Sequence, residues 1–160
     1  MIDISVLTGE RLTYISRAAD MLVLSFGDDI CRNYRGEWLS RYALHCQCAW
    51  RITDGHGKIV LARVDIFSPP EGEDYTLDFD WDVRGNNAFD RKSVEILSGG
   101  EVTVTAARLV NGCDIKLELS NGLRFESFAD SSLEEHWRLV VRDEDNPVQL
   151  VAEPTGIREV

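Results

Sequence analysis

The stretch TLDFDWDVRG places a carboxylate at every second position, at Asp78, Asp80 and Asp82. Carboxylates are ligands that hard cations such as Ca²⁺ prefer, and a row of them also attracts basic protein surfaces. An EF-hand calcium loop starts with this spacing, but it then requires a glycine at its sixth position and a bidentate glutamate at its twelfth. This chain has Val83 and Phe89 at those positions, so we predict no calcium loop.

The residues between the aspartates are large and apolar, and this alternation predicts a strand over Thr76–Val83 with one charged and one buried face. The preceding loop adds further carboxylates, and residues 70–83 contain no lysine or arginine. The predicted acidic patch consists of Glu71, Glu73, Asp74, Asp78, Asp80 and Asp82. Three interpretations are open at this point: the solvated face of a strand, a docking surface for a basic protein, or a weak cation site.

A second set of side chains would form an acid–base cluster if the fold brought them into one cleft. These residues are His45, Glu135, His136 and Arg138. The alternative is a cross-strand charge ladder, worth at most about 1 kcal/mol per pair. The chain contains no G-x-S-x-G, H-E-x-x-H, Walker or G-x-G-x-x-G motif. We therefore predict no catalytic residue and no cofactor.

Cys46 and Cys48 form a C-x-C pair, whereas a zinc knuckle would need two C-x-x-C pairs. On a strand running through residues 42–52, both sulfurs would lie on the same apolar face. Buried free cysteines behave as small hydrophobic residues. We therefore predict that the pair packs in the core, reduced, and binds no metal.

The composition narrows the class of partner. The chain of 160 residues is 44% hydrophobic, which suits one folded domain over residues 1–160. Its net charge of −11 repels phosphate backbones, so we predict no nucleic-acid binding and favour a basic protein partner. The start MIDISVLTGE has no basic segment followed by a long apolar one, and no apolar run could span a bilayer. We therefore expect a cytoplasmic protein without a membrane segment.

Four short blocks recur in the same order in the two halves of the chain. The matched pairs are Leu7–Ile15 with Leu97–Thr105, Leu22–Ile30 with Ile115–Leu123, Ala49–Thr53 with His136–Val140, and Lys58–Ala62 with Val148–Ala152. Collinear self-similarity indicates a duplicated unit. We predict pseudo-repeats over residues 7–62 and 97–152, joined by residues 63–96.

Two Trp-Arg dipeptides, Trp50-Arg51 and Trp137-Arg138, occupy equivalent places in the two repeats. Neighbouring residues of a strand point to opposite faces. We therefore predict that both tryptophans point into the core and that both arginines point outward or pair with carboxylates on neighbouring strands.

The second half alternates between apolar and polar residues, as half-buried antiparallel strands do. The predicted strands are 101–110, 113–120, 123–128, 135–142 and 148–152. Asn-Gly dipeptides at Asn111 and Asn121 are typical of tight hairpin turns. Apolar spacing after Asn87 predicts a short helix that ends before Gly99. The fold class predicted is mainly β, an antiparallel β-sandwich or flattened barrel with one or two short helices; α+β is the second choice.

The blocks LHCQCAWRI, NNAFD and LELSNGLRFESFADSSLEEHWRL together resemble a family of small uncharacterised bacterial proteins. The resemblance covers most of the chain, roughly residues 7–152, and rests on turn and core residues. It implies no enzyme and no cofactor. Some members of that family are associated with toxin–immunity gene neighbourhoods, where acidic proteins block basic toxins.

Three function classes follow from the sequence. The first is a non-enzymatic, acidic and immunity-like protein that binds a basic partner. The second is a β domain that binds a small ligand in a pocket lined by Trp50, Trp81 or Trp137, and the third is an enzyme without a recognisable motif. Exposed edge strands also allow a homodimer.

Overall fold

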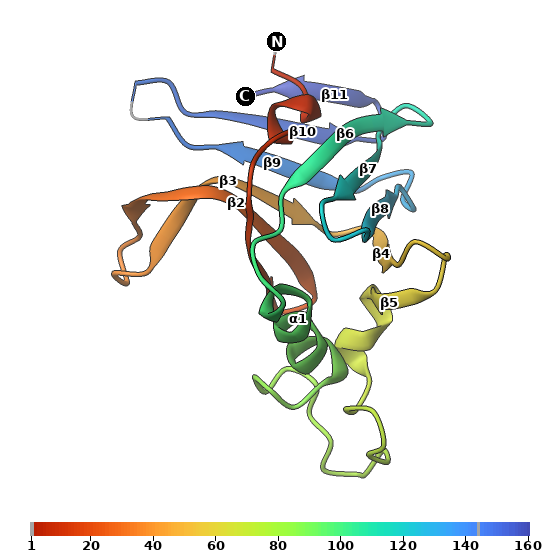
Figure 1. Ribbon diagram of the computed structural model, residues 1–160. Coiled ribbons are helices and arrows are strands. Elements are labelled where there is room, and N and C mark those ends of the chain that lie inside the picture. The colour runs from red at the N-terminus through yellow and green to blue at the C-terminus, as the bar shows by residue number, and fades with distance from the viewer. Residues whose placement is uncertain (1, 144) are drawn as a thin grey trace.

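The computed structural model describes residues 2–143 and 145–160, which form two antiparallel sheets packed face to face with one α-helix at their end (Figure 1). The first sheet has six strands in the order β1-β2-β3-β9-β10-β11. Their bounds are Leu12–Ala18, Met21–Arg32, Trp38–Cys46, Trp137–Val141, Val148–Glu153 and Gly156–Glu159.

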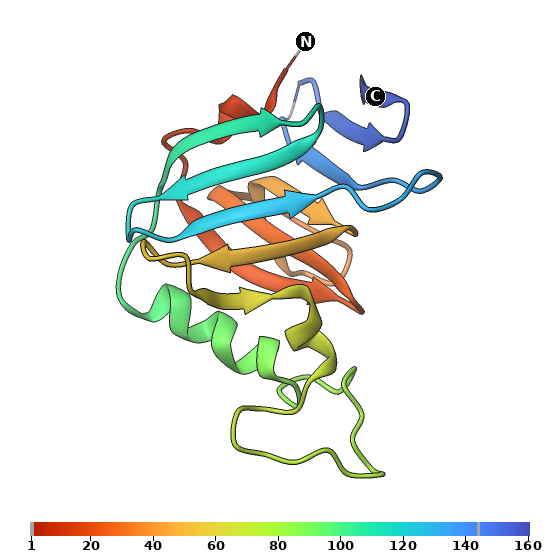
Figure 2. The same cartoon turned by 90° about the vertical axis from the view of Figure 1, so that its right-hand side faces the viewer.

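The second sheet has five strands in the order β5-β4-β8-β7-β6, visible face-on in Figure 2. Their bounds are Ile59–Ala62, Ala49–Thr53, Arg124–Phe128, Asp114–Leu119 and Val104–Val110. Both sheets are open within the described residues, so the sandwich prediction is confirmed and the barrel alternative is not.

The core lies between the sheets. Strand β7 shows the reason: its even-numbered residues are half-buried, whereas Ile115, Leu117 and Leu119 point inward and are buried. Trp50 from β4 and Trp137 from β9 are also buried, as the sequence predicted. Trp50 contacts the ring of Phe125 from β8 at a centroid distance of 6.4 Å.

Each sheet combines strands from both halves of the chain. Strands β1, β2 and β3 are followed across the first sheet by β9 and β10. In the second sheet, β6, β7 and β8 are followed in the same way by β4 and β5. Apart from β11, which lies outside both predicted repeats, the order of one sheet becomes that of the other when each strand is replaced by its counterpart in the other predicted repeat. This regularity agrees with the repeated blocks, while the duplication itself stays a prediction.

All five strands predicted in the second half are present, with slightly different ends. Asn111 and Gly112 both have positive φ, 51° and 90°, as a tight hairpin between β6 and β7 requires. One expectation for the first half was wrong, because residues 42–52 do not form a single strand. The chain leaves the first sheet after Cys46 and enters the second sheet at Ala49.

The helix η1 packs beside β6, whereas η2 and α1 lie together at the opposite end of the sandwich (Figure 2). The 3₁₀ helix η1 spans Ile4–Leu7 and η2 spans Arg63–Phe67. The single α-helix of the described chain, α1, spans Ala88–Ser98 and confirms the predicted short helix. Its N-cap residue Asn87 accepts a hydrogen bond from the Asp90 N–H at 2.7 Å. None of the helices in residues 2–143 and 145–160 is both long and apolar enough to cross a membrane.

Candidate functional site

The predicted acidic patch lies on a loop that projects from the body of the molecule between η2 and α1, at the bottom of Figures 1 and 2. We call residues 68–86 the acidic loop. The predicted strand Thr76–Val83 is wrong, since this segment consists of turns and has no strand partner. Leu77, expected in a buried face, is fully exposed.

The aspartates make turns instead of alternating along a strand. Asp80 accepts a hydrogen bond from the Asp82 N–H at 3.0 Å through its side chain, and Asn86 donates to its carbonyl at 2.8 Å. Aspartate and asparagine favour such local side chain–backbone bonds. At the base of the loop, the side chain of Asn87 donates to the Trp81 carbonyl at 2.9 Å.

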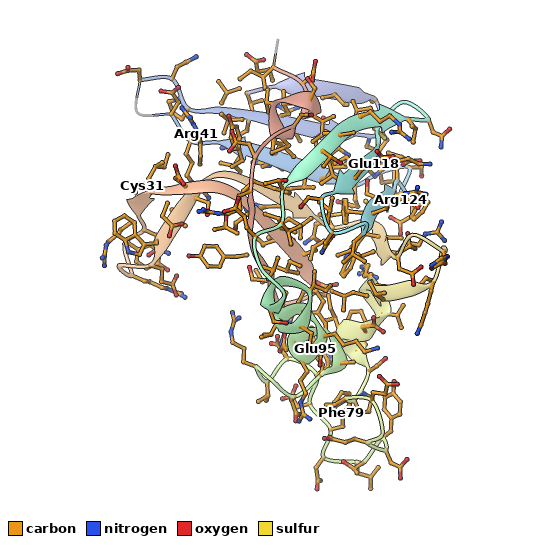
Figure 3. All side chains as sticks on the ribbon, viewed as in Figure 1. Cys31, Arg41, Phe79, Glu95, Glu118 and Arg124 are labelled. Carbon is orange, nitrogen blue, oxygen red and sulfur yellow. The ribbon has the colours of Figure 1, made fainter. Side chains whose placement is uncertain are left out.

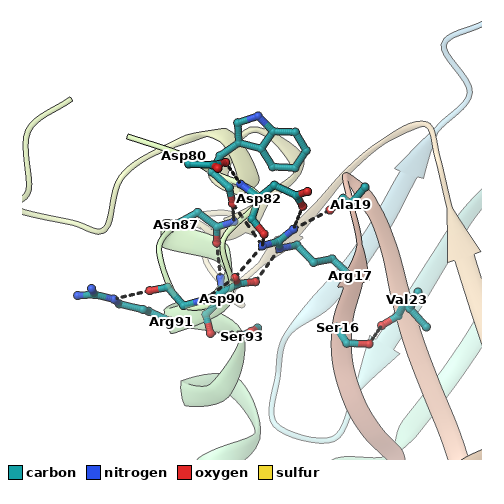
Figure 4. Close-up of polar contacts among 12 residues, drawn as sticks. Ser16, Arg17, Ala19, Val23, Asp80, Asp82, Asn87, Asp90, Arg91 and Ser93 are labelled. Atoms are coloured by element: carbon teal, nitrogen blue, oxygen red, sulfur yellow. Dashed lines mark hydrogen bonds and ion pairs between the residues drawn. The ribbon is translucent and has the colours of Figure 1, made fainter. Parts of the chain in front are cut away.

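Arg17 connects the acidic loop to the sandwich (Figure 4). It lies opposite Leu22 in the β1–β2 register and its side chain is only 3% exposed. Its guanidinium pairs with Asp90 of α1 at 2.8 Å and with Asp82 at 3.0 Å. It also donates to the carbonyls of Trp81 and Asp82, at 3.3 and 3.1 Å. One buried cation thus joins strand, loop and helix.

The electrostatics of this contact follow from its geometry. Burial alone would raise the pKa of Asp90, but hydrogen bonds from Arg17 and from the Gly85 N–H hold the pKa of Asp90 below its ordinary value. The pKa of Arg17 is raised, first by its hydrogen bond to Asp90, with burial opposing the rise. Both groups are therefore charged at neutral pH, and the ionised carboxylate of Asp90 stabilises the folded protein.

This pair predicts a specific acid sensitivity. Since the pKa of Asp90 is lower in the folded than in the unfolded chain, its contribution is fully present above the unfolded value and is lost as pH falls below about 4. We expect the free energy of unfolding of the wild-type protein to fall more steeply between pH 5 and pH 3 than that of Asp90→Asn. Urea denaturation at several pH values measures this, and equal slopes would contradict it.

The six predicted carboxylates divide into two groups. Three form ion pairs within the molecule: Glu71 with Lys92 at 3.8 Å, Glu73 with Arg91 at 3.0 Å, and Asp82 with Arg17. In the part of the chain that the structure describes, the other three have no ion-pair partner and are exposed: Asp74, Asp78 and Asp80.

The unpaired carboxylates lie next to exposed apolar residues in the sequence. Tyr75 is 69% exposed and packs edge-on against Phe79 at a centroid distance of 5.6 Å, while Leu77 contacts solvent on all sides. We define the acidic tip as Asp74, Tyr75, Leu77, Asp78 and Asp80. The sequence identified its carboxylates but placed Leu77 on a buried face.

The residues of the candidate acid–base cluster do not line one cleft, although three of them lie near one another: burial, Arg142 and Arg138 lower the pKa of His45, and Glu135 opposes this shift. Arg138 pairs with Glu135 at 2.8 Å and donates to Gln149 at 2.8 Å. His45 lies opposite Arg138 in the β3–β9 register but lines a different cavity from Glu135. His136 is buried. The Glu135–Arg138 pair is thus a local structural contact.

Arg51, the other arginine of the Trp-Arg pairs, contacts Glu126 on the neighbouring strand β8 at 3.6 Å. Glu126 also lies 3.7 Å from the ammonium group of Lys116 on β7. These three side chains form a cross-strand charge ladder, and Arg51 pairs with a carboxylate on a neighbouring strand as the sequence predicted.

Cys46 and Cys48 are buried, in agreement with the predicted core packing. Their sulfur atoms are 3.5 Å apart at the corner where the chain changes sheets. The hydrogen bond to Cys48 and burial together raise the pKa of the Cys46 thiol well above its ordinary value, so this thiol is protonated. Within residues 2–143 and 145–160, no three His, Cys, Asp or Glu side chains are placed to hold a metal ion.

Comparison with known proteins gives no match to a protein-family model, to a curated protein or to a solved structure. The family resemblance therefore stays a prediction.

Proposed function

We propose that this protein is a non-enzymatic interaction protein that binds a basic protein partner through its acidic tip. The observation that carries the proposal is the full exposure of Leu77 in the projecting acidic loop, where it is flanked in sequence by carboxylates that no cation of the described chain neutralises. An immunity-like role, in which the partner is a basic toxin, is the specific form of this proposal that the family resemblance favours.

The composition of the tip suits an interface. Aromatic and aliphatic side chains form the centre of most protein interfaces, with a polar rim that adds specificity and speeds association. Here Tyr75 and Leu77 supply the apolar centre, and Asp74, Asp78 and Asp80 supply the charged rim. An exposed leucine gains nothing for the isolated protein, so its burial by a partner would supply binding energy.

Preorganisation adds to the fit. The Arg17 contact and the neighbouring Asp80 turn fix the course of the loop at its base before any partner binds. A loop that is ordered in the free protein loses less conformational entropy on binding. Since Glu71, Glu73 and Asp82 already form ion pairs, the proposed docking surface is smaller than the patch predicted from the sequence.

The test starts from partner capture. The immobilised protein is exposed to lysate of its source organism at low and at moderate salt, and a retained basic protein is identified, purified and titrated. We expect the triple variant Asp74/Asp78/Asp80→Lys to bind this protein at least tenfold more weakly, because three attractive charges become repulsive. Leu77→Ser should also weaken binding without changing the salt dependence.

A matched control changes the same net charge elsewhere. Asp28, Glu134 and Asp145 are exposed and lie outside the acidic loop. The triple variant Asp28/Glu134/Asp145→Lys should bind within about threefold of wild type, because distant exposed charges are screened by salt. Equal weakening by both triple variants would show attraction to net charge alone, and binding unchanged by Leu77→Ser and by the tip lysines would refute the proposal.

A further inference from the structure

The outer face of β1, β2 and β3 is hollowed beside α1 into a groove with a volume of about 1000 Å³. In Figure 3 it lies between the β2–β3 hairpin, where Cys31 is labelled, and α1, where Glu95 is labelled. Pockets of roughly 300–1,000 Å³ take drug-sized molecules. None of Trp50, Trp81 and Trp137 lines the groove, so it is a different site from the pocket expected from the sequence.

The wall of the groove is amphipathic. Its apolar part comes from both sheet and helix: Ile15, Val23, Leu39, Ala43, Val94 and Leu97. Hydroxyl groups of Ser16, Ser25 and Ser93 lie along the same wall. A long apolar surface with a few polar groups is the usual composition of a small-molecule site.

Arg142 provides a positive charge in the groove. Its side chain lines the cavity and donates one hydrogen bond, at 2.5 Å, to the carbonyl of Ser40. No carboxylate in residues 2–143 or 145–160 lies within ion-pair distance of it. Burial lowers its pKa, yet an arginine stays charged at any physiological pH. A half-buried guanidinium with a single neutral acceptor retains donors that can bind an anion.

The other charged residues that line the groove are one arginine and one glutamate. Arg84 also lines the groove, and the one carboxylate among the lining residues, Glu37, already accepts a hydrogen bond from Asn33 at 2.8 Å. A chain with a net charge of −11 thus places two arginines against one glutamate in this cavity. The carboxylate of Asp29 also lies at the groove, where it accepts hydrogen bonds from Tyr14 and Ser40. The preference for an anion therefore rests on Arg142, whose guanidinium has no carboxylate partner among the described residues.

We propose that this groove binds a small amphipathic organic acid, with the carboxylate on Arg142 and the apolar body along β1–β3 and α1. This site lies away from the acidic tip and does not depend on the proposed protein docking. Arg142 supplies the charge and hydrogen bonds, the Ser25 hydroxyl supplies a further donor, and Val94 and Leu97 of α1 cover one side of the apolar tail.

The test uses dodecanoate, a fatty acid with a twelve-carbon chain, and dodecanol as its uncharged counterpart. Isothermal titration calorimetry below the micelle concentration measures both. We expect dodecanoate to bind wild type at least tenfold more tightly than dodecanol, and Arg142→Gln to remove most of this difference, because a hydrogen-bonded ion pair in a partly buried site is lost.

Arg142→Gln could disturb the local fold, so a pair of charge variants at a second position tests the proposal without changing Arg142. Val94 lines the groove on α1, is 69% exposed, and tolerates either charge without loss of core packing. Val94→Lys should raise the ratio of dodecanoate affinity to dodecanol affinity and Val94→Glu should lower it, each by about threefold, because both variants lose the same apolar contact and differ in charge. Arg158→Gln, on the edge strand β11 away from the groove, should change nothing.

Two results would overturn the proposal. One is the absence of dodecanoate binding to folded wild type at millimolar concentration. The other is equal binding of dodecanoate and dodecanol that none of the three groove variants alters, which would indicate non-specific apolar association. Circular dichroism of each variant confirms that the fold is retained.

Discussion

Replacing Arg17 with methionine should lower the free energy of unfolding by about 3 kcal/mol, the largest effect that we expect from any polar substitution in this chain. The substitution leaves Asp90, whose side chain is only 10% exposed, without its cation. A buried charge that loses its partner costs several kcal/mol, far more than a surface ion pair contributes. The carbonyls of Trp81 and Asp82 lose their donor at the same time.

The measurement is urea denaturation followed by circular dichroism. The matched control is Arg158→Met, because Arg158 also pairs with a carboxylate, Glu153 at 3.0 Å, but at the surface. We expect this control to leave the unfolding midpoint nearly unchanged. The double variant Arg17→Met/Asp90→Asn should recover part of the lost stability, because it removes the orphaned charge as well.

Limited proteolysis separates the two roles of Arg17. If it anchors the acidic loop, Arg17→Met should be cleaved within residues 68–86 under conditions where the sandwich stays folded. An Arg17→Met protein that unfolds at the wild-type urea concentration and keeps its loop intact would show that the contact contributes little.

The strands of the second half could be predicted from sequence because each alternates cleanly and is bounded by a turn signal. In β7, Ile115, Leu117 and Leu119 mark the inner face, and Asn-Gly turns stand at both ends. The corner at Gln47 could not be found in the same way. Apolar alternation continues through it, because inward-facing residues of both sheets point into one core.

The strand predicted over Thr76–Val83 in the acidic loop was wrong for a related reason. Alternation in Thr76–Val83 specifies two faces, but a strand also needs a neighbour that pairs with its backbone, and sequence alternation alone does not show one. The composition carried a contrary signal, since aspartate is depleted in strands and enriched in turns. The exposure of Leu77 and the turn at Asp80 are consistent with that preference.

Arg17, the residue that positions the loop, was missed altogether. Its partners are far away in the sequence, with Asp90 separated from it by 73 positions, so no local pattern connects them. The available signal was weak: an arginine stands where the alternation after Ile15 calls for an inward-facing residue. Arg142 is similar, since only the fold brings it beside Ser40 of β3 and into the groove that α1 and β1 also border.

The two tryptophans of the repeated Trp-Arg pairs should differ in their contribution to stability, although their positions correspond. The indole N–H of Trp137 donates to the carbonyl of Cys113 at 2.7 Å. The indole N–H of Trp50 is buried without a hydrogen-bond partner among the described residues. An unsatisfied buried donor costs about 1–3 kcal/mol, so removing it offsets part of the loss when the ring is made smaller.

We therefore expect Trp137→Phe to lower the free energy of unfolding by about 2–3 kcal/mol, and Trp50→Phe by about 1 kcal/mol or less. Each variant is the other's control, because both exchange the same ring at corresponding places in the two sheets. Trp50 also keeps its aromatic neighbours Phe89 and Phe125, which a phenylalanine ring can still contact. Urea denaturation followed by circular dichroism measures both, and equal losses would mean that the Trp50 N–H carries no penalty in the folded protein.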